Sequence, residues 1–162
     1  MLIKRVVINA SPLIVLFKSQ QADLLPQLFS EIFVPAGVWD EVTVTSQNDA
    51  ASQQLSSVTW AQRVEIGESP PEVAAWDLGK GESEVLSLAL KDSNLAAIVD
   101  DRAARRCSQA LSIITIGTGR LIILAKQRGL IPSVSPRIQA LQDAGLWLSN
   151  NLVNLLLSQA GE

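Results

Sequence analysis

Residues 81–106 read GESEVLSLALKDSNLAAIVDDRAARR, and this stretch indicates the fold. Apolar residues within 85–90 recur at helical spacing and predict an amphipathic helix. The following run, 95–99, is apolar without alternation, which is typical of a strand buried on both faces of a parallel sheet. Asp100 and Asp101 come next, and functional groups gather at the carboxyl ends of strands in open α/β sheets. The search for a functional site therefore begins at this carboxylate pair.

The composition excludes several classes of chemistry. The chain has no histidine and one cysteine, Cys107, so Ser-His-Asp and Cys-His catalysis and zinc sites built from His or several Cys are excluded within one chain. Metal chemistry must then use oxygen ligands, which favours Mg²⁺ or Mn²⁺. No apolar run approaches the roughly 20 residues of a membrane span, and the N-terminal segment lacks the order of a signal peptide. We expect a cytoplasmic protein without membrane contact, folded as one domain over residues 1–162.

The net charge of −3 conceals an asymmetry along the chain. Residues 19–101 hold 14 acidic and three basic side chains, whereas residues 102–142 hold seven basic and no acidic ones. Two interpretations stay open here: an acidic centre beside a basic surface that binds phosphates, and ordinary solvated helix faces.

Strands and helices are expected to alternate along the chain. The patterns predict strands at 6–8, 32–34, 95–99 and 113–116, with an edge strand within 58–66. They predict helices at 13–19, 22–29, 36–44, 45–57, 72–78, 120–128, 136–144 and 149–160. This order indicates an α/β sandwich around a mostly parallel sheet.

Polar residues follow several of these elements near one end of the predicted sheet. They are Asn9, Glu41, Glu84 and Asp101, with Asp100 and Ser11 beside them. Carboxylates gathered without histidine suit a magnesium site that positions and activates water against a phosphodiester. The sequence therefore predicts a hard-metal site at this end of the sheet.

Five segments of the chain resemble the PIN-domain family of metal-dependent ribonucleases. They are VVINASPLIVL, VPAGVWDEV, GESEVLSLAL, IVDDRAARR and ITIGTGRLIIL, and the resemblance covers nearly the whole chain. It is closest to a prokaryotic PIN-like subgroup with a Gly-Glu-x-Glu helix and an Asp-Asp-Arg strand end. The resemblance implies a three-layer α/β/α fold and cleavage of single-stranded RNA, often as the toxin of a toxin–antitoxin pair.

The family's acidic positions fall, by this resemblance, on four residues. The first falls on Asn9, the acid after the second strand on Glu41, the central-helix acid on Glu84, and the strand-end acid on Asp101, with Asp100 as the near alternative. Asn9 departs from the usual aspartate, so one negative charge is lost. The resemblance thus implies that Asn9, Glu84, Asp101 and Asp100 contact Mg²⁺ or Mn²⁺.

Neighbouring polar and aromatic residues receive structural roles. We expect Glu82 to complement the dipole at the start of its helix, and Ser11 and Thr118 to be helix N-caps. Ser11 has a second interpretation, in which its hydroxyl orients Asn9 or a metal-bound water. The four tryptophans are expected in the core or at interfaces rather than as platforms for bases. They are Trp39, Trp60, Trp76 and Trp147.

The basic segment supplies the predicted RNA contacts. Arg102, Arg105 and Arg106 lie at i, i+3 and i+4 and share one helix face, and we expect them, with Arg120, to flank the acidic cleft and contact the RNA backbone. The expected partners are single-stranded RNA, an antitoxin protein and a second copy of the chain.

Two competing interpretations remain. One is a catalytically degenerate PIN-like module that binds RNA or protein without cleaving, which Asn9 favours. The other starts from Val99-Asp100-Asp101, an acid pair that also occurs in receiver domains. Receiver domains need a further aspartate and a lysine at other strand ends, and neither is evident in the sequence.

Overall fold

The computed structural model describes residues 2–44 and 49–162, and in this described part the chain forms a five-stranded sheet. All neighbouring strands are parallel, in the order β3-β2-β1-β4-β5. Val6 of β1 is in register with Ile32 of β2 on one side and with Ala96 of β4 on the other. The strands are β1 (Arg5–Ile8), β2 (Glu31–Pro35), β3 (Ala61–Val64), β4 (Leu95–Ile98) and β5 (Thr115–Ile116).

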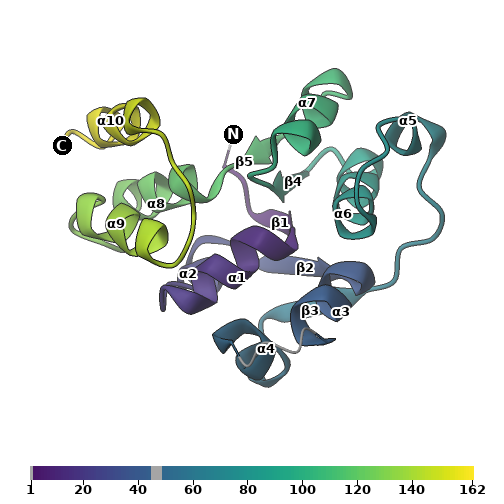
Figure 1. The fold of residues 1–162 in the computed structure, drawn as a ribbon, viewed down its shortest axis with the longest axis horizontal. Helices are drawn as coiled ribbons and strands as arrows, with labels where there is room; N and C mark the ends of the chain where they lie inside the picture. The colour runs from purple at the N-terminus through teal and green to yellow at the C-terminus, as the bar shows by residue number, and fades with distance from the viewer. Residues whose placement is uncertain (1, 45–48) are drawn as a thin grey trace.

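Helices flank both faces of this sheet (Figure 1). Helices α6 (Lys80–Lys91) and α7 (Arg102–Ala110) cover one face. The other face is covered by α1 (Ala10–Lys18), α2 (Leu24–Leu28) and α8 (Thr118–Gln127). The remaining helices are α3 (Ala36–Val44), α4 (Ala50–Gln54), α5 (Pro71–Ala74), α9 (Ser135–Asp143) and α10 (Asn150–Gln159). The predicted α/β/α sandwich with a parallel central sheet is confirmed.

The strands are apolar on both sides because both faces of the sheet are covered. Every residue of β4 is buried, and Val6, Val7 and Ile8 of β1 are fully buried. Helix α3 contacts both α1 and α6, so it lies near the end of the sheet rather than over its middle. Among the described residues, none of the helices is long and apolar enough to cross a bilayer.

Two predicted helix caps are wrong. Helix α1 begins at Ala10 with Asn9 as its N-cap, so Ser11 already lies inside the first turn. Helix α8 begins at Thr118, and Gly117 is its N-cap. In both cases the helix begins almost directly after the strand. One extended residue, Asn9 before α1 and Gly117 before α8, separates the two elements and is the N-cap.

Other elements are shorter than the sequence indicates. The helix expected at 45–57 is α4 followed by a 3₁₀ turn, Leu55–Ser57, and its residues 45–48 lie outside the described residues. Asp49 is the N-cap of α4, because its side chain accepts a hydrogen bond from the Ser52 amide. The expectation of one domain over residues 1–162 stays a prediction.

The strand order places a topological switch between β1 and β4. From β1 the chain proceeds outward to β2 and β3, then crosses to β4 on the opposite side of β1 and continues to β5. The connections on the two sides of β1 diverge, which leaves a crevice at the carboxyl ends of these two central strands. Asn9 follows β1 and Asp100 follows β4, so the predicted polar residues meet at this crevice.

Candidate active site

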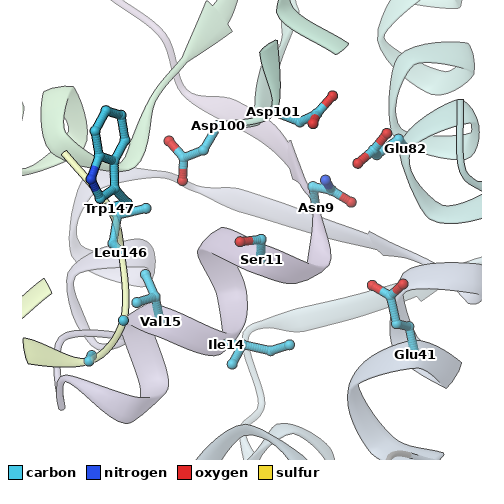
Figure 2. A pocket seen from close by; sticks show the side chains of 12 residues that line it. Asn9, Ser11, Ile14, Val15, Glu41, Glu82, Asp100, Asp101, Leu146 and Trp147 are labelled. Atoms are coloured by element: carbon cyan, nitrogen blue, oxygen red, sulfur yellow. The ribbon is translucent and has the colours of Figure 1, made fainter. Parts of the chain in front are cut away.

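A cavity of about 530 Å³ opens at the carboxyl ends of β1 and β4. This volume lies within the range of about 300–1,000 Å³ that small-ligand sites occupy. Figure 2 shows Glu41 and Glu82 on one side of it, Trp147 with Leu146 on the other, and Asn9 and Asp100 between them. Its lining consists of Asn9, Ser11, Ile14, Val15, Glu41, Glu82, Asp100, Asp101, Ala144, Gly145, Leu146 and Trp147.

Asn9 lies at the centre of the cavity, between β1 and α1. Its backbone amide donates a hydrogen bond to the Ile98 carbonyl of β4, at 3.1 Å, so the residue is held to both central strands. Its side chain is only 4% exposed. Among the described groups, the Asn9 side chain does not bond to the amides of its own helix, although Asn is a common N-cap residue. Its side-chain amide donates instead to the Glu82 carboxylate.

Asp100 and Asp101 both line the cavity, and each also caps a helix. Asp100 accepts hydrogen bonds from the Thr118 amide, at 2.9 Å, and from the Thr118 hydroxyl. Asp101 is the N-cap of α7 and accepts from the Ala104 amide at 2.9 Å. These bonds satisfy amides that a helix leaves without partners in its first turn, and they fix the orientation of both carboxylates.

Glu82 brings a third carboxylate into the cavity from the first turn of α6. Burial, followed by the nearby charges of Asp101 and Glu41, raises the pKa of Glu82 above its ordinary value. Hydrogen bonds from the Gly79 backbone and the Asn9 side-chain amide lower this pKa in part. The raised pKa of Glu82 thus reflects first the burial of its carboxylate and second the nearness of two other acids.

The structure places Glu84 elsewhere, which corrects the prediction that Glu84 shares a cavity with Glu41 and Asp101. Glu84 is 6% exposed, and its Oε1 accepts a hydrogen bond from the Gly37 amide at 3.0 Å. It does not line the cavity formed by the described residues. Glu82 and Glu84 are two positions apart on a helix, so their side chains point in widely different directions.

Glu41 and Ser11 complete the polar wall from two other helices. Glu41 lies on α3, on the same side of the cavity as Glu82, and Ser11 lies in the first turn of α1 (Figure 2). Both residues are exposed to solvent. Asn9, Glu41 and Asp101 thus line one cavity, with Asp100 and Ser11 beside them.

Two of the predicted RNA-binding arginines lie beside the acidic cavity. Arg105 and Arg120 line a cavity of about 200 Å³ that also includes Asp100, and a further one of about 660 Å³. Gly117 permits this proximity, since a Cβ there would lie 3.1 Å from Arg105 Nη1 and 3.4 Å from Asp100 Oδ1. In the described chain neither arginine makes an ion pair. A basic surface therefore adjoins the acidic cavity at Asp100.

The other two arginines are placed differently. Arg102 and Arg106 are exposed on α7, but they line none of the cavities described above. The predicted shared face of Arg102, Arg105 and Arg106 therefore contributes only Arg105 to the surface next to the acids.

The chemistry of the site suits a hard divalent cation. Its charged and amide groups offer only oxygen ligands, as Mg²⁺ and Mn²⁺ prefer. Among residues 2–44 and 49–162, however, no group of three or more acidic, His or Cys side chains is close enough to form a ready-made metal site. Magnesium commonly keeps several waters and binds through one or two carboxylates plus substrate phosphates. The arrangement fits a cation that is held weakly without substrate.

Glu82 and Trp147 line this cavity, although the sequence indicates only structural roles for them. Glu82 is the third helical residue after the N-cap Gly79, the position from which a glutamate reaches back to the N-cap amide. That position also places Glu82 at the end of α6 nearest the strand ends. Its place in the first turn is therefore the signal in the sequence that could have assigned Glu82 to the site. Trp147 follows Gly145, a helix-ending signal, in a short segment before the next helix.

A family model described as a PIN domain matches residues 5–162 of the chain. Among curated proteins, no sequence matches.

Proposed function

This chain belongs to the PIN-domain family, and from that premise we propose that it is a metal-dependent endoribonuclease that cleaves single-stranded RNA. PIN domains form a nuclease-like family that generally binds RNA and depends on divalent metals. The observation that carries the proposal is the cavity itself, in which Glu82, Asp100 and Asp101 surround Asn9 at the topological switch. The raised pKa of Glu82 supports it, because a bound cation would stabilise a carboxylate that burial and the neighbouring charges of Asp101 and Glu41 otherwise destabilise.

We assign the metal contacts to Glu82 and Asp101, with Asp100 and the Asn9 carbonyl oxygen beside them. Glu82 takes the role that sequence reasoning gave to Glu84. When bound, Mg²⁺ or Mn²⁺ supplies Lewis acidity at the phosphodiester and makes water a better nucleophile. Glu41, across from Asp100 in the cavity, is exposed and can accept a proton from that water.

The remaining residues orient these groups. Thr118 holds Asp100 through two hydrogen bonds, and the Ala104 amide holds Asp101, so neither carboxylate must be ordered when substrate binds. Arg105 and Arg120 bind the RNA backbone beyond Asp100, on the side away from Glu82. Because the arginines lie next to the acids and not among them, they attract the strand without neutralising the metal site.

A second candidate function is a PIN module that binds RNA or a protein without cleaving. Asn9 favours it, because Asn9 removes one of the negative charges that hold a cation. We also propose a role as the toxin of a toxin–antitoxin pair, a cytoplasmic location and a homodimer. A neighbouring gene for a small DNA-binding protein would support the toxin role.

A cleavage assay across a manganese titration tests the proposal. Labelled single-stranded RNA is incubated with the wild type, Glu82→Gln and Glu84→Gln. The two variants lose the same charge from the same helix, so each controls for the other. We expect weak manganese-stimulated cleavage by the wild type, none by Glu82→Gln, and retained cleavage at saturating Mn²⁺ by Glu84→Gln. An inert wild type that still binds RNA would favour the binding module, and an active Glu82→Gln would remove Glu82 from the site.

A further inference from the structure

The cavity that holds the acids has a second, apolar half. Val15 of α1 and Leu146 and Trp147 of the α9–α10 connection line the side away from Glu82 and Glu41, and Ile14 of α1 lies between them and Glu41 (Figure 2). Ser11, Ile14 and Val15 lie at i, i+3 and i+4, so one face of α1 runs beneath the whole cavity. Over these residues the lining changes from polar to apolar within about 6 Å along the helix axis.

Trp147 is the most exposed large apolar side chain of the described residues, at 82%. An exposed tryptophan forgoes the burial that usually stabilises this side chain, since burial contributes roughly 25 cal/mol per Å² of apolar surface. Trp76 is the other tryptophan exposed above one third, at 38%, and it does not line the cavity of the described chain. Exposure next to the acids thus distinguishes Trp147 from the other tryptophans.

Capping motifs hold the connection that carries Trp147 at both ends. The Gly145 amide donates to the Gln142 carbonyl and the Leu146 amide to the Leu141 carbonyl, each at 3.0 Å, which is the Schellman pattern of a helix end. Gly145 has φ +110°, a conformation that favours glycine. At the other end, the Ser149 hydroxyl accepts from the Leu152 amide at 3.1 Å and caps α10.

The two flanking helices are themselves tied together. The Glu162 carboxylate, just after α10, accepts hydrogen bonds from the Val134 and Ser135 amides at the start of α9, at 2.7 and 3.1 Å. A close contact also holds α10 against α8, because a Cβ on Gly119 would lie 2.7 Å from Leu156 Cδ1. The backbone around Trp147 is therefore fixed although its ring is exposed, and a fixed, exposed ring offers a stacking surface that needs little ordering on binding.

We propose that Trp147 and the apolar half of the cavity form a nucleobase subsite, in which a base of single-stranded RNA stacks on the Trp147 ring. Ile14 and Val15 form its floor and Leu146 its wall. Every base has a π face, so such a platform binds single strands with little sequence preference. The phosphate of the same nucleotide then lies toward Asp100 and Asn9. This inference rests on the proposed function, since it places a base beside the residues that would act on the phosphodiester.

The test measures RNA binding in the Glu82→Gln background, where the proposed function predicts no cleavage. Fluorescence anisotropy with a short labelled single-stranded RNA, in the presence of Mn²⁺, compares Trp147→Ala, Trp147→Phe and the control Trp76→Ala. We expect Trp147→Ala to raise the Kd about 5- to 100-fold, Trp147→Phe to restore most of the affinity, and Trp76→Ala to change nothing. A strand of the same length with abasic sites should bind equally well with and without Trp147.

Three results would overturn the subsite. One is an unchanged Kd in Trp147→Ala, and another is an equal loss of affinity for the normal and the abasic strand. The third is dissociation of a dimer by Trp147→Ala with no effect on RNA, which would make the ring a contact between copies of the chain. Failure of the proposed function is seen separately, as an inert wild type in the cleavage assay, while Trp147-dependent binding can persist in that case.

Discussion

Glu84 Oε1 accepts a hydrogen bond from the Gly37 amide at 3.0 Å, which joins the buried middle of α6 to the first turn of α3. The amides of a first helical turn have no partner within their own helix, and a negative charge there also interacts favourably with the helix dipole. Glu84 thus caps α3 from a neighbouring element. Since α3 carries Glu41 and α6 carries Glu82, this bond fixes the positions of two acids of the cavity, although Glu84 itself does not line the cavity formed by the described residues.

Glu84→Gln should therefore lower stability rather than abolish metal-dependent activity. The Gln oxygen can still accept from Gly37, but a charge-assisted bond is lost and the new amide protons are buried. We expect a loss of about 1–3 kcal/mol in the free energy of unfolding, which lowers Tm by several degrees. Thermal unfolding of Glu84→Gln beside the wild type measures it. Gly37→Ala should also destabilise, because its Cβ would meet the Glu84 carboxylate; an unchanged Tm in both variants would contradict the capping role.

Glu82→Gln should have the opposite effect on stability. Because the pKa of Glu82 is raised in the folded protein, the folded state binds more protons than the unfolded state between the two pKa values. Stability therefore falls as pH rises through that window, and the penalty remains at neutral pH. Glu82→Gln removes it, so we expect Tm at pH 7 to rise by about 1–4 °C without metal.

The pH dependence provides the control for this prediction. Below the ordinary carboxyl pKa of about 4.3, Glu82 is protonated in both states, so the difference between wild type and Glu82→Gln should vanish. Added Mn²⁺ should raise Tm in the wild type, because a ligand that binds only the folded state stabilises it, and should raise it less in Glu82→Gln. An advantage of Glu82→Gln that grows at low pH would contradict the direction of the pKa shift.

Asp101 combines a capping role with the proposed metal role, and two substitutions separate them. Asparagine caps helices about as well as aspartate, so Asp101→Asn should keep the bond to the Ala104 amide and leave Tm nearly unchanged without metal. Asp101→Ala should lose about 1 kcal/mol. Both variants should fail to cleave RNA. Full cleavage by Asp101→Asn at low Mn²⁺ would limit Asp101 to its structural role.

The sequence predicts the sheet well because its signals are local. The apolar run that becomes β4 follows from burial on both faces of the sheet. The boundary between β2 and α3, at Pro35 and Ala36, follows from the backbone restrictions of proline. Helix α3 has the bounds that the sequence predicts. The sequence misplaces the cap of α1 because Ser11-Pro12 is a strong local start signal, whereas the helix begins directly after β1 at Ala10.

The site is less predictable because it depends on which element faces which. Both Glu82 and Glu84 lie near the start of α6, and only the packing of α6 against α3 decides that Glu84 meets Gly37 while Glu82 meets the cavity. Trp147 poses the same difficulty. Its sequence context indicates a turn between helices, but not that α1 and the strand ends lie next to that turn.

Arg105 and Arg120 should account for part of the salt dependence of RNA binding. Each phosphate contact on a single strand contributes about 0.7 to the slope of log K against log salt concentration, so alanine at both positions should reduce the slope by about 1.4. The matched control is Arg102→Ala with Arg106→Ala, which removes the same charge from residues that line none of the three cavities. Equal slopes in the two double variants would mean that charge, and not position, governs binding.

Asn9→Asp tests how the centre of the cavity balances stability against metal affinity. The Asn9 amide donates to Glu82, and this bond lowers the pKa of Glu82, so Asn9 partly relieves the crowding of the acids. An aspartate would remove that donor and add a charge beside Glu82, at a cost of the order of 1 kcal/mol. Without metal, we expect Tm to fall by about 2–4 °C. With Mn²⁺ the same charge becomes favourable, so the metal-induced rise in Tm should exceed that of the wild type. Half-maximal RNA cleavage should then need less Mn²⁺.

Thermal unfolding and cleavage over one manganese titration measure both effects, with Ser11→Ala as the neighbouring control that changes no charge. A lower Tm without any gain in manganese response would mean that Asn9 acts only on the stability of the acids and does not contact the cation.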